Sequence, residues 1–133
     1  MIIFLHKFFK MVFIIVFMFR KVLKFSTKGN TDVINISDEV KGVVSKSGVD
    51  SGVVNLFVVG STAGLSCFEA DAYLEDDLKD FFQRIIPSNK EYHHHKRWSD
   101  DNGHSHVRAT LIKPDLSIPF QDKKLMTGTW QQI

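Results

Sequence analysis

The sequence predicts a single α+β domain with mostly antiparallel β-sheets and two main helices. Its 133 residues are enough to bury one core and too few for two ordinary domains. Apolar residues make up 44% of the chain and charged residues 24%, as in compact globular proteins. Short apolar runs lie between turn residues before and after the helical stretches, and hairpin signals gather late in the chain, which favours antiparallel pairing.

Residues 1–19 form an apolar N-terminal extension, and residues 20–133 form the predicted domain. The run Met11–Phe19 is far shorter than the roughly twenty residues of a membrane-spanning helix, and no small-residue cleavage site follows it. Two interpretations remain: an uncleaved membrane-associating segment, or translation from a start codon upstream of the true one. The regular pattern that begins near Met18 favours the second.

The first predicted elements of the domain are a strand over Lys21–Ser26, a turn at Thr27–Asn30 and a return strand over Asp32–Asn35. A helix follows with Ser37 as its hydroxyl cap, because two acidic residues come directly after it and favour the positive end of the helix dipole. Gly48 is a natural end for this helix.

The run Val53–Val59 is β-branched and aromatic, which predicts a central strand buried on both faces. Gly60–Gly64 then forms a turn or loop at its C-terminal end. Apolar residues over Leu74–Ile85 recur at helical spacing and predict an amphipathic helix, which Pro87 ends.

Pro87–Gly103 has no apolar period, and a polar stretch of this length predicts a functional loop. Strands are expected at Val107–Ile112 and Leu116–Phe120. A hairpin opens at Lys123–Lys124, and Thr129–Ile133 is the start of a further strand.

The charge balance excludes some partners. Seventeen basic and fifteen acidic residues give a net charge of +2, which is too weak to indicate nucleic-acid binding. Cys67 is the only cysteine, so no intrachain disulfide can form, and a reducing cytoplasmic setting is expected. A lone cysteine among small residues is interpreted as a packing residue, and no membrane contact is expected for residues 20–133.

Five of the six histidines lie between His93 and His106. On a strand, His104 and His106 would share one face, and a loop residue such as His94 could complete a three-histidine zinc site with one open position. The alternative is a solvated loop at His93–His95, with His106 as a hydrogen-bonded residue at a strand edge.

Two further sites are possible outside the histidine stretch. Gly60–Gly64 could offer Ser61, Thr62 and backbone N–H groups to an anion, although a tight turn explains the same residues. Most acidic residues near the second helix are interpreted as a solvated face. Glu69 lies close to the glycine loop and could be a general base or a metal ligand.

Several short motifs, taken together and in order, resemble the YjbQ-like family, which is also known as the secondary thiamine-phosphate synthase family. The resemblance covers Val22 to Ile133 and implies an α+β domain that assembles as a homotrimer with sites near subunit boundaries. The motifs that carry it are Gly60-Ser-Thr-Ala-Gly, Glu69, Asp77-Leu, Ile86-Pro, Tyr92-His-His, Asp101-Asn-Gly-His-Ser-His, Ile118-Pro-Phe and Thr127-Gly-Thr-Trp-Gln-Gln.

The resemblance also implies site residues. It points to His94 and His106, with Glu69, Asp101 and Asn102 near them, Trp130–Gln131 packed close by and His104 as a candidate third ligand. Many members carry histidine-threonine-threonine where this chain has Gly60-Ser-Thr. Members also continue beyond Trp-Gln-Gln into a strand with an arginine-rich segment, whereas this sequence stops at Ile133, so the C-terminal strand is expected to be truncated.

Three functions follow as hypotheses. The family name implies an enzyme that joins a pyrimidine pyrophosphate to a thiazole phosphate. The histidines favour zinc over Mg²⁺, although Mg²⁺ remains possible, and they suggest a zinc-dependent hydrolase or lyase of a small phosphorylated metabolite with Glu69 or Asp101 as base. The third hypothesis is a non-catalytic trimer that binds a metal or a small ligand.

Overall fold

The structure, a computed structural model, describes residues 18–133. The expected N-terminal extension therefore lies almost wholly outside the described residues. Within residues 18–133, no helix is long and apolar enough to cross a membrane. The elements in order are α1 (Ser37–Lys46), β1 (Gly52–Phe57), β2 (Phe68–Glu69), α2 (Ala72–Ile85), α3 (His95–Trp98), α4 (Gly103–Ile112), β3 (Asp115–Gln121), β4 (Lys124–Leu125) and β5 (Gln131–Gln132).

The strands form two antiparallel sheets, which confirms the predicted α+β class. β3 lies between β1 and β4, and β2 pairs with β5. The predicted hairpin is also confirmed: Gln121 pairs with Lys124, and the two residues between them have positive φ, the conformation that a two-residue hairpin turn requires.

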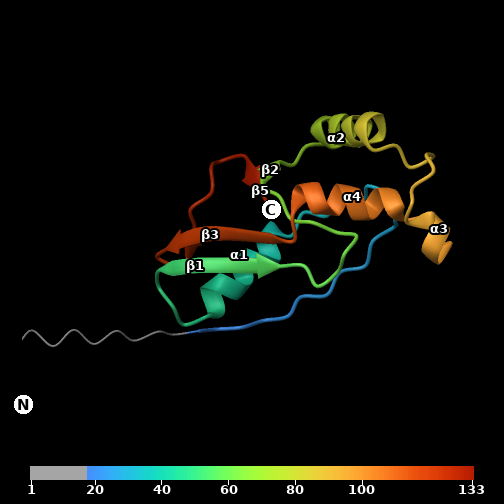
Figure 1. The fold of residues 1–133 in the computed structure, drawn as a ribbon. Coiled ribbons are helices and arrows are strands. Elements are labelled where there is room, and N and C mark those ends of the chain that lie inside the picture. Colours follow the sequence, from blue (N-terminus) through green and yellow to red (C-terminus); the bar gives the residue numbers. More distant parts are fainter. Residues whose placement is uncertain (1–17) are drawn as a thin grey trace, which may run out of the picture.

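The core lies between α1 and the larger sheet. Val40 and Val44, one helical turn apart, pack against Ile118 and Phe120, which alternate on the inner face of β3. Ile133 joins the same cluster. Figure 1 shows α1 behind β1 and β3, with α4 and then α2 above the sheet.

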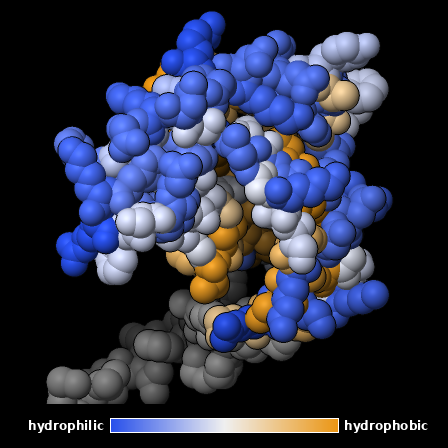
Figure 2. Space-filling model, turned by 90° about the vertical axis from the view of Figure 1, so that its right-hand side faces the viewer, coloured by the Kyte–Doolittle hydropathy of each residue, from blue (hydrophilic) through white to orange (hydrophobic). Residues whose placement is uncertain are grey.

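β1 differs from the prediction of a strand buried on both faces. It is an edge strand, since β3 is its only partner in the described sheet. Val53 is 66% exposed and Phe57 64% exposed. The β-branched run is typical of a strand that is buried on both faces, but only one face of β1 packs against α1. Apolar side chains accordingly reach the surface in the lower part of Figure 2, below a polar upper half.

The expected strands over Lys21–Ser26 and Asp32–Asn35 are not formed, although the turn between them is present, with Asp32 N donating to Gly29 O at 3.1 Å. Both stretches are extended, and neither pairs with the other. Ser37 is not the helix cap, because its hydroxyl accepts a hydrogen bond from Ile133 N at 2.8 Å and it lies inside α1.

The stretch Val107–Ile112 was predicted as a strand and belongs instead to α4. His104, Arg108 and Ile112 lie at i, i+4 and i+8, which is helical spacing. Because the first two are polar, this spacing does not form an apolar stripe in the sequence. α4 also makes three helices of ten or more residues, one more than the two predicted. The helix over Leu74–Ile85 is confirmed as α2, capped by Asp71, whose carboxylate accepts from two backbone N–H groups.

Candidate functional site

The junction between α3 and α4 is organised by His95. Gly103 N donates to His95 Nε2 at 3.1 Å, and Tyr92 N donates to Nδ1 of the same ring at 3.5 Å. Nδ1 in turn lies 3.4 Å from a carboxylate oxygen of Asp101. The imidazole thereby ties α3 to the first residue of α4 and holds a tight loop in which Ser99 and Asp101 have positive φ.

A close backbone approach explains the glycine at the start of α4. A Cβ on Gly103 would lie 2.6 Å from Tyr92 Cβ and 3.1 Å from His95 Nε2. Tyr92 is itself fixed, because its hydroxyl donates to Pro87 O at 2.8 Å. The loop expected over Pro87–Gly103 is thus ordered by internal hydrogen bonds and contains the short helix α3.

The candidate site at this junction is a pair of histidines. The rings of His94, at the start of α3, and His106, in the second turn of α4, have centroids 4.4 Å apart. An oxygen of Asp100 lies 3.6 Å from His94 Nε2. Both side chains of this ion pair are partly exposed, so solvent or a small ligand can reach the pair. A carboxylate beside one of two adjacent imidazoles suits proton transfer or anion binding.

His104 does not share a face with His106, as the strand prediction required. Two positions along a helix are about 200° apart, and His104 is turned into the protein, 8% exposed, with its ring near Tyr92. Burial lowers the pKa of His104, and the Arg108 charge lowers it further. His104 Nδ1 and Asn102 Oδ1 are both buried without a hydrogen-bond partner, which is a cost unless a water or ligand meets them.

The three-histidine zinc arrangement does not fit this geometry. Among residues 18–133, no group of three or more His, Cys, Asp or Glu side chains is placed to hold a metal ion. The pair offers two imidazoles and one carboxylate at most, and His104 points elsewhere. The same finding leaves Mg²⁺ without a set of carboxylates among the described residues.

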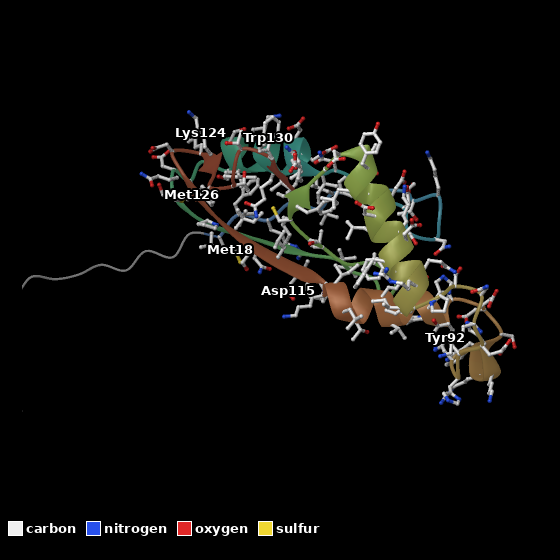
Figure 3. All side chains as sticks on the ribbon, turned by 90° about the horizontal axis from the view of Figure 1, so that it is seen from above. Met18, Tyr92, Asp115, Lys124, Met126 and Trp130 are labelled. Atoms are coloured by element: carbon white, nitrogen blue, oxygen red, sulfur yellow. The ribbon has the colours of Figure 1, made fainter. Side chains whose placement is uncertain are left out.

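The remaining predicted residues lie away from the pair. Ser61 and Thr62 are exposed in the loop after β1, which returns beneath the C-terminal end of α4, where Leu65 N donates to Lys113 O. Glu69 pairs with Gln131 in the β2–β5 sheet. Figures 1 and 3 show α3 and Tyr92 at the N-terminal end of α4, and β2, β5 and Trp130 well away toward its other end.

Two residues that were not among the predicted site residues make important contacts, although Asp100 was noted as part of the histidine cluster. Asp100 partners His94, and its place between the two histidine motifs was the only available signal. Arg108 is 6% exposed and donates to Ile86 O, Gln83 and the turn at Asn30–Thr31. Cys67 is half-buried against the core, where burial raises the pKa of its thiol, as expected for a packing residue.

Fold and site together define a small α+β domain with a solvent-accessible histidine pair at a helix junction. A family model described as "UPF0047 protein YjbQ-like" matches residues 21–133. The chain therefore belongs to the YjbQ-like UPF0047 family, as the sequence motifs indicated.

Relatives and solved structures agree with this assignment. A "UPF0047 protein" of Methanothermobacter thermautotrophicus is 30% identical over 84% of this chain and 76% of the relative, and one of Archaeoglobus fulgidus is 30% identical over 84% of each. The crystal structure of a "YbjQ-like protein of unknown function" from Sulfolobus solfataricus superposes with a TM-score of 0.75 at 30% identity, covering 81% of this chain and 77% of that one. None of these descriptions assigns an activity.

Proposed function

We propose that this chain is an enzyme of small phosphorylated metabolites, with chemistry of the thiamine-phosphate synthase type. The observation that carries the proposal is the pairing of two imidazoles. The ring centroids of His94 and His106 lie 4.4 Å apart, and Asp100 lies beside His94. Lys96 and Arg97 are exposed on α3, two and three residues after His94 in the sequence, so cationic side chains belong to the same short helix. Such a cluster favours an anionic ligand.

The reaction needs no covalent bond between the substrates and the protein. A thiazole nitrogen bonds to the methylene carbon of the pyrimidine, and the carbon–oxygen bond to pyrophosphate breaks with the electron pair leaving on oxygen. A protonated imidazole placed at the leaving oxygen would stabilise the departing charge. Asp100 would orient His94, and His106 would contact the leaving group from the other side.

The test is the rate of product formation from the two phosphorylated substrates, followed together with pyrophosphate release. His94→Ala and His106→Ala should each lower kcat/KM by about 100-fold, the usual contribution of one acid–base group. His93→Ala is the matched control, because His93 is exposed in the same segment and should change the rate by less than about twofold. Equal rates in all three variants would refute the role of the pair.

A homotrimer forms part of the proposal. Within one chain β2, which carries Glu69, lies away from α3 and the start of α4 (Figure 1). The residues that the resemblance places together could therefore meet only across a subunit boundary. Mixing inactive Glu69→Gln chains with inactive His106→Ala chains should then restore activity, because a mixed boundary carries both native residues. Failure of every mixture to recover activity would argue that each site is built within one chain.

A zinc-dependent hydrolase or lyase of a phosphorylated metabolite is the second candidate. Imidazole and carboxylate are the donor types zinc prefers. Because no three such side chains of residues 18–133 are placed to hold a metal ion, His94 and His106 would need a further ligand from a second chain. Elemental analysis of protein purified without added metal should then find near-stoichiometric zinc that falls in both histidine variants. Metal without turnover on any phosphorylated substrate would instead indicate a binding trimer, and absence of metal would exclude the zinc candidate.

A further inference from the structure

The junction between α3 and α4 contains the residue pair Asn102–Gly103. Asn102 is the only one of the chain's five asparagines that is followed by glycine. In such a pair the backbone nitrogen of the second residue can attack the side-chain amide of the first and close a succinimide ring, and glycine has no Cβ to hinder the approach. The turn that positions the histidine pair therefore contains both reactants for its own modification.

The reaction is deamidation, and its only co-reactant is water. Gly103 N forms a bond to Asn102 Cγ, and the bond from Cγ to Nδ2 breaks. The leaving nitrogen departs as ammonia, because the proton of Gly103 N reaches it through the solvent. Water then opens the succinimide at one of its two carbonyl groups. Opening at Cγ gives aspartate, whereas opening at the backbone carbonyl gives isoaspartate, in which the main chain runs through Cβ and Cγ and is longer by a carbon.

The folded structure holds Gly103 N away from this reaction. The ψ angle of Asn102 is 13°, so Gly103 N is nearly eclipsed with Asn102 N, whereas ring closure requires it to be eclipsed with Cβ. Gly103 N also donates to His95 Nε2 at 3.1 Å. Rotation about the Cα–C bond of Asn102 would break this hydrogen bond and move Gly103, which has no free space on the side of Tyr92. His95 therefore opposes the reactive rotation.

The asparagine side chain itself is held less firmly. Asn102 is the N-cap of α4, but its side chain makes no capping hydrogen bond, and Oδ1 is buried without a partner among residues 18–133. An unpaired buried oxygen is a cost that opening to water would remove. The neighbouring Asp101 has a φ of 51°, a left-handed conformation that residues with a side chain seldom adopt. Release of Gly103 N by His95 would thus let the junction relax as well as react.

We propose that Asn102–Gly103 is a deamidation site that His95 keeps closed, and that its conversion to isoaspartate uncouples the histidine pair. His94 precedes the junction and His106 follows it, with ring centroids 4.4 Å apart. A longer main chain between them takes Gly103 out of reach of His95 and moves the start of α4 relative to α3. The proposal rests on this geometry and does not depend on the proposed activity.

The rate of deamidation tests the role of His95. The full chain is incubated at mildly alkaline pH, digested, and read by mass spectrometry for the conversion of amide to acid at Asn102. Asn102 should react at least about tenfold more slowly in the folded chain than in the same chain unfolded in urea, because reaction requires local opening. The exposed Asn89 is the internal reference for the effect of urea. His95→Ala should remove most of the protection, whereas His95→Gln, whose Oε1 can accept in place of Nε2, should retain it.

A matched control separates local opening from a general loss of stability. Asp71→Ala removes the cap of α2 and weakens the fold away from the junction, so Asn102 should stay protected in this variant. Equal rates in the folded and unfolded chains would overturn the proposal, as would a rate in His95→Ala no higher than in Asp71→Ala.

The NMR signals of the His94 ring test the uncoupling. In the parent, His106→Ala should shift them, because the two rings are adjacent. In isoaspartyl protein isolated by chromatography, the same substitution should leave them unchanged. Asn102→Asp keeps the main-chain length and should retain the coupling. His94 signals that still respond to His106→Ala in the isoaspartyl form would overturn the proposed uncoupling.

Discussion

Replacing Arg108 should destabilise the fold more than any other single change to an exposed or buried cation in the described chain. Arg108 Nε and Nη2 donate to Ile86 O at 3.0 and 2.7 Å, at the C-terminal end of α2. Nη1 donates to Asn30 and Thr31, in the turn before α1. One guanidinium therefore joins α4, α2 and the N-terminal turn, which share no strand pairing.

The magnitude follows from what Arg108→Ala leaves behind. Each net hydrogen bond to a charged group contributes about 1.5–3 kcal/mol, but the bonds share one group and are not additive. The Ile86 carbonyl lies in a buried residue, and leaving it unpaired costs a further 1–3 kcal/mol, approximately. The free energy of unfolding should fall by about 3–5 kcal/mol, measured by urea denaturation with circular dichroism.

Two variants make the reasoning refutable. Arg108→Lys keeps the charge but loses the planar fork, so it should recover only part of the loss. Arg84→Ala removes an arginine that is exposed on α2 and should cost less than about 0.5 kcal/mol. A loss in Arg108→Ala no larger than in Arg84→Ala would show that the buried guanidinium does not hold these elements together.

The other predictions concern single positions. Gly103→Ala should lower the free energy of unfolding by about 1–3 kcal/mol, measured by thermal or urea unfolding, because its Cβ would overlap Tyr92. Gly42→Ala should raise it by about 0.5–1 kcal/mol, because Gly42 lies in α1 with open space around it. Asp71→Ala should cost about 1 kcal/mol by loss of the α2 cap, with Asp71→Asn retaining most of it. Burial lowers the pKa of His104 below its ordinary 6.5, so the folded state binds fewer protons than the unfolded state. The stability that neutral His104 gives is complete above pH 6.5 and is lost as the pH falls through the lowered pKa. In His104→Gln, the urea midpoint should depend less on pH between pH 7.5 and 5 than in the parent. An unchanged dependence on pH would contradict the assignment to His104.

The sequence predicted the elements whose signal is local. α2 carries a helical stripe ended by Pro87, and β3 alternates between two turns, so both were placed within a few residues. α4 was mistaken for a strand because its buried face includes His104 and Arg108. A hydrophobic pattern cannot register a face whose buried residues are polar.

The strands expected over residues 21–26 and 32–35 failed for a different reason. Strand propensity describes a fit to a pleated, paired surface, and pairing depends on a neighbour that local sequence does not name. Here the first segment lies across a groove from β1. In the second segment Asp32 N donates to Gly29 O and closes the preceding turn, and the contact with Ile133 O is made by Ile36, just after the segment. β1 does form a strand, but its apolar run predicted burial on two faces, and only one face is covered in the structure.

The candidate site was predictable in composition and not in geometry. The clustering of histidines indicated the segment that forms the junction between α3 and α4, and the pair His94 and His106 is what the family resemblance implies. The role of His95 as a structural acceptor for Gly103 N could not be predicted, because adjacent histidines are equivalent until the backbone turn between α3 and α4 is known. The same turn decides that Asp100 meets His94 while Asp101 meets His95.

The helix α4 explains why the residues named by the motifs do not all meet in one chain. Its ten residues span about 15 Å, with the histidine pair near its first turns and Lys113 beside the approach to β2 at its end. A carboxylate on Glu69 is too short to bridge that length. The proposed chemistry therefore has two arrangements to test: a site confined to the His94–His106 end, or a site completed by the β2–β5 end of another copy.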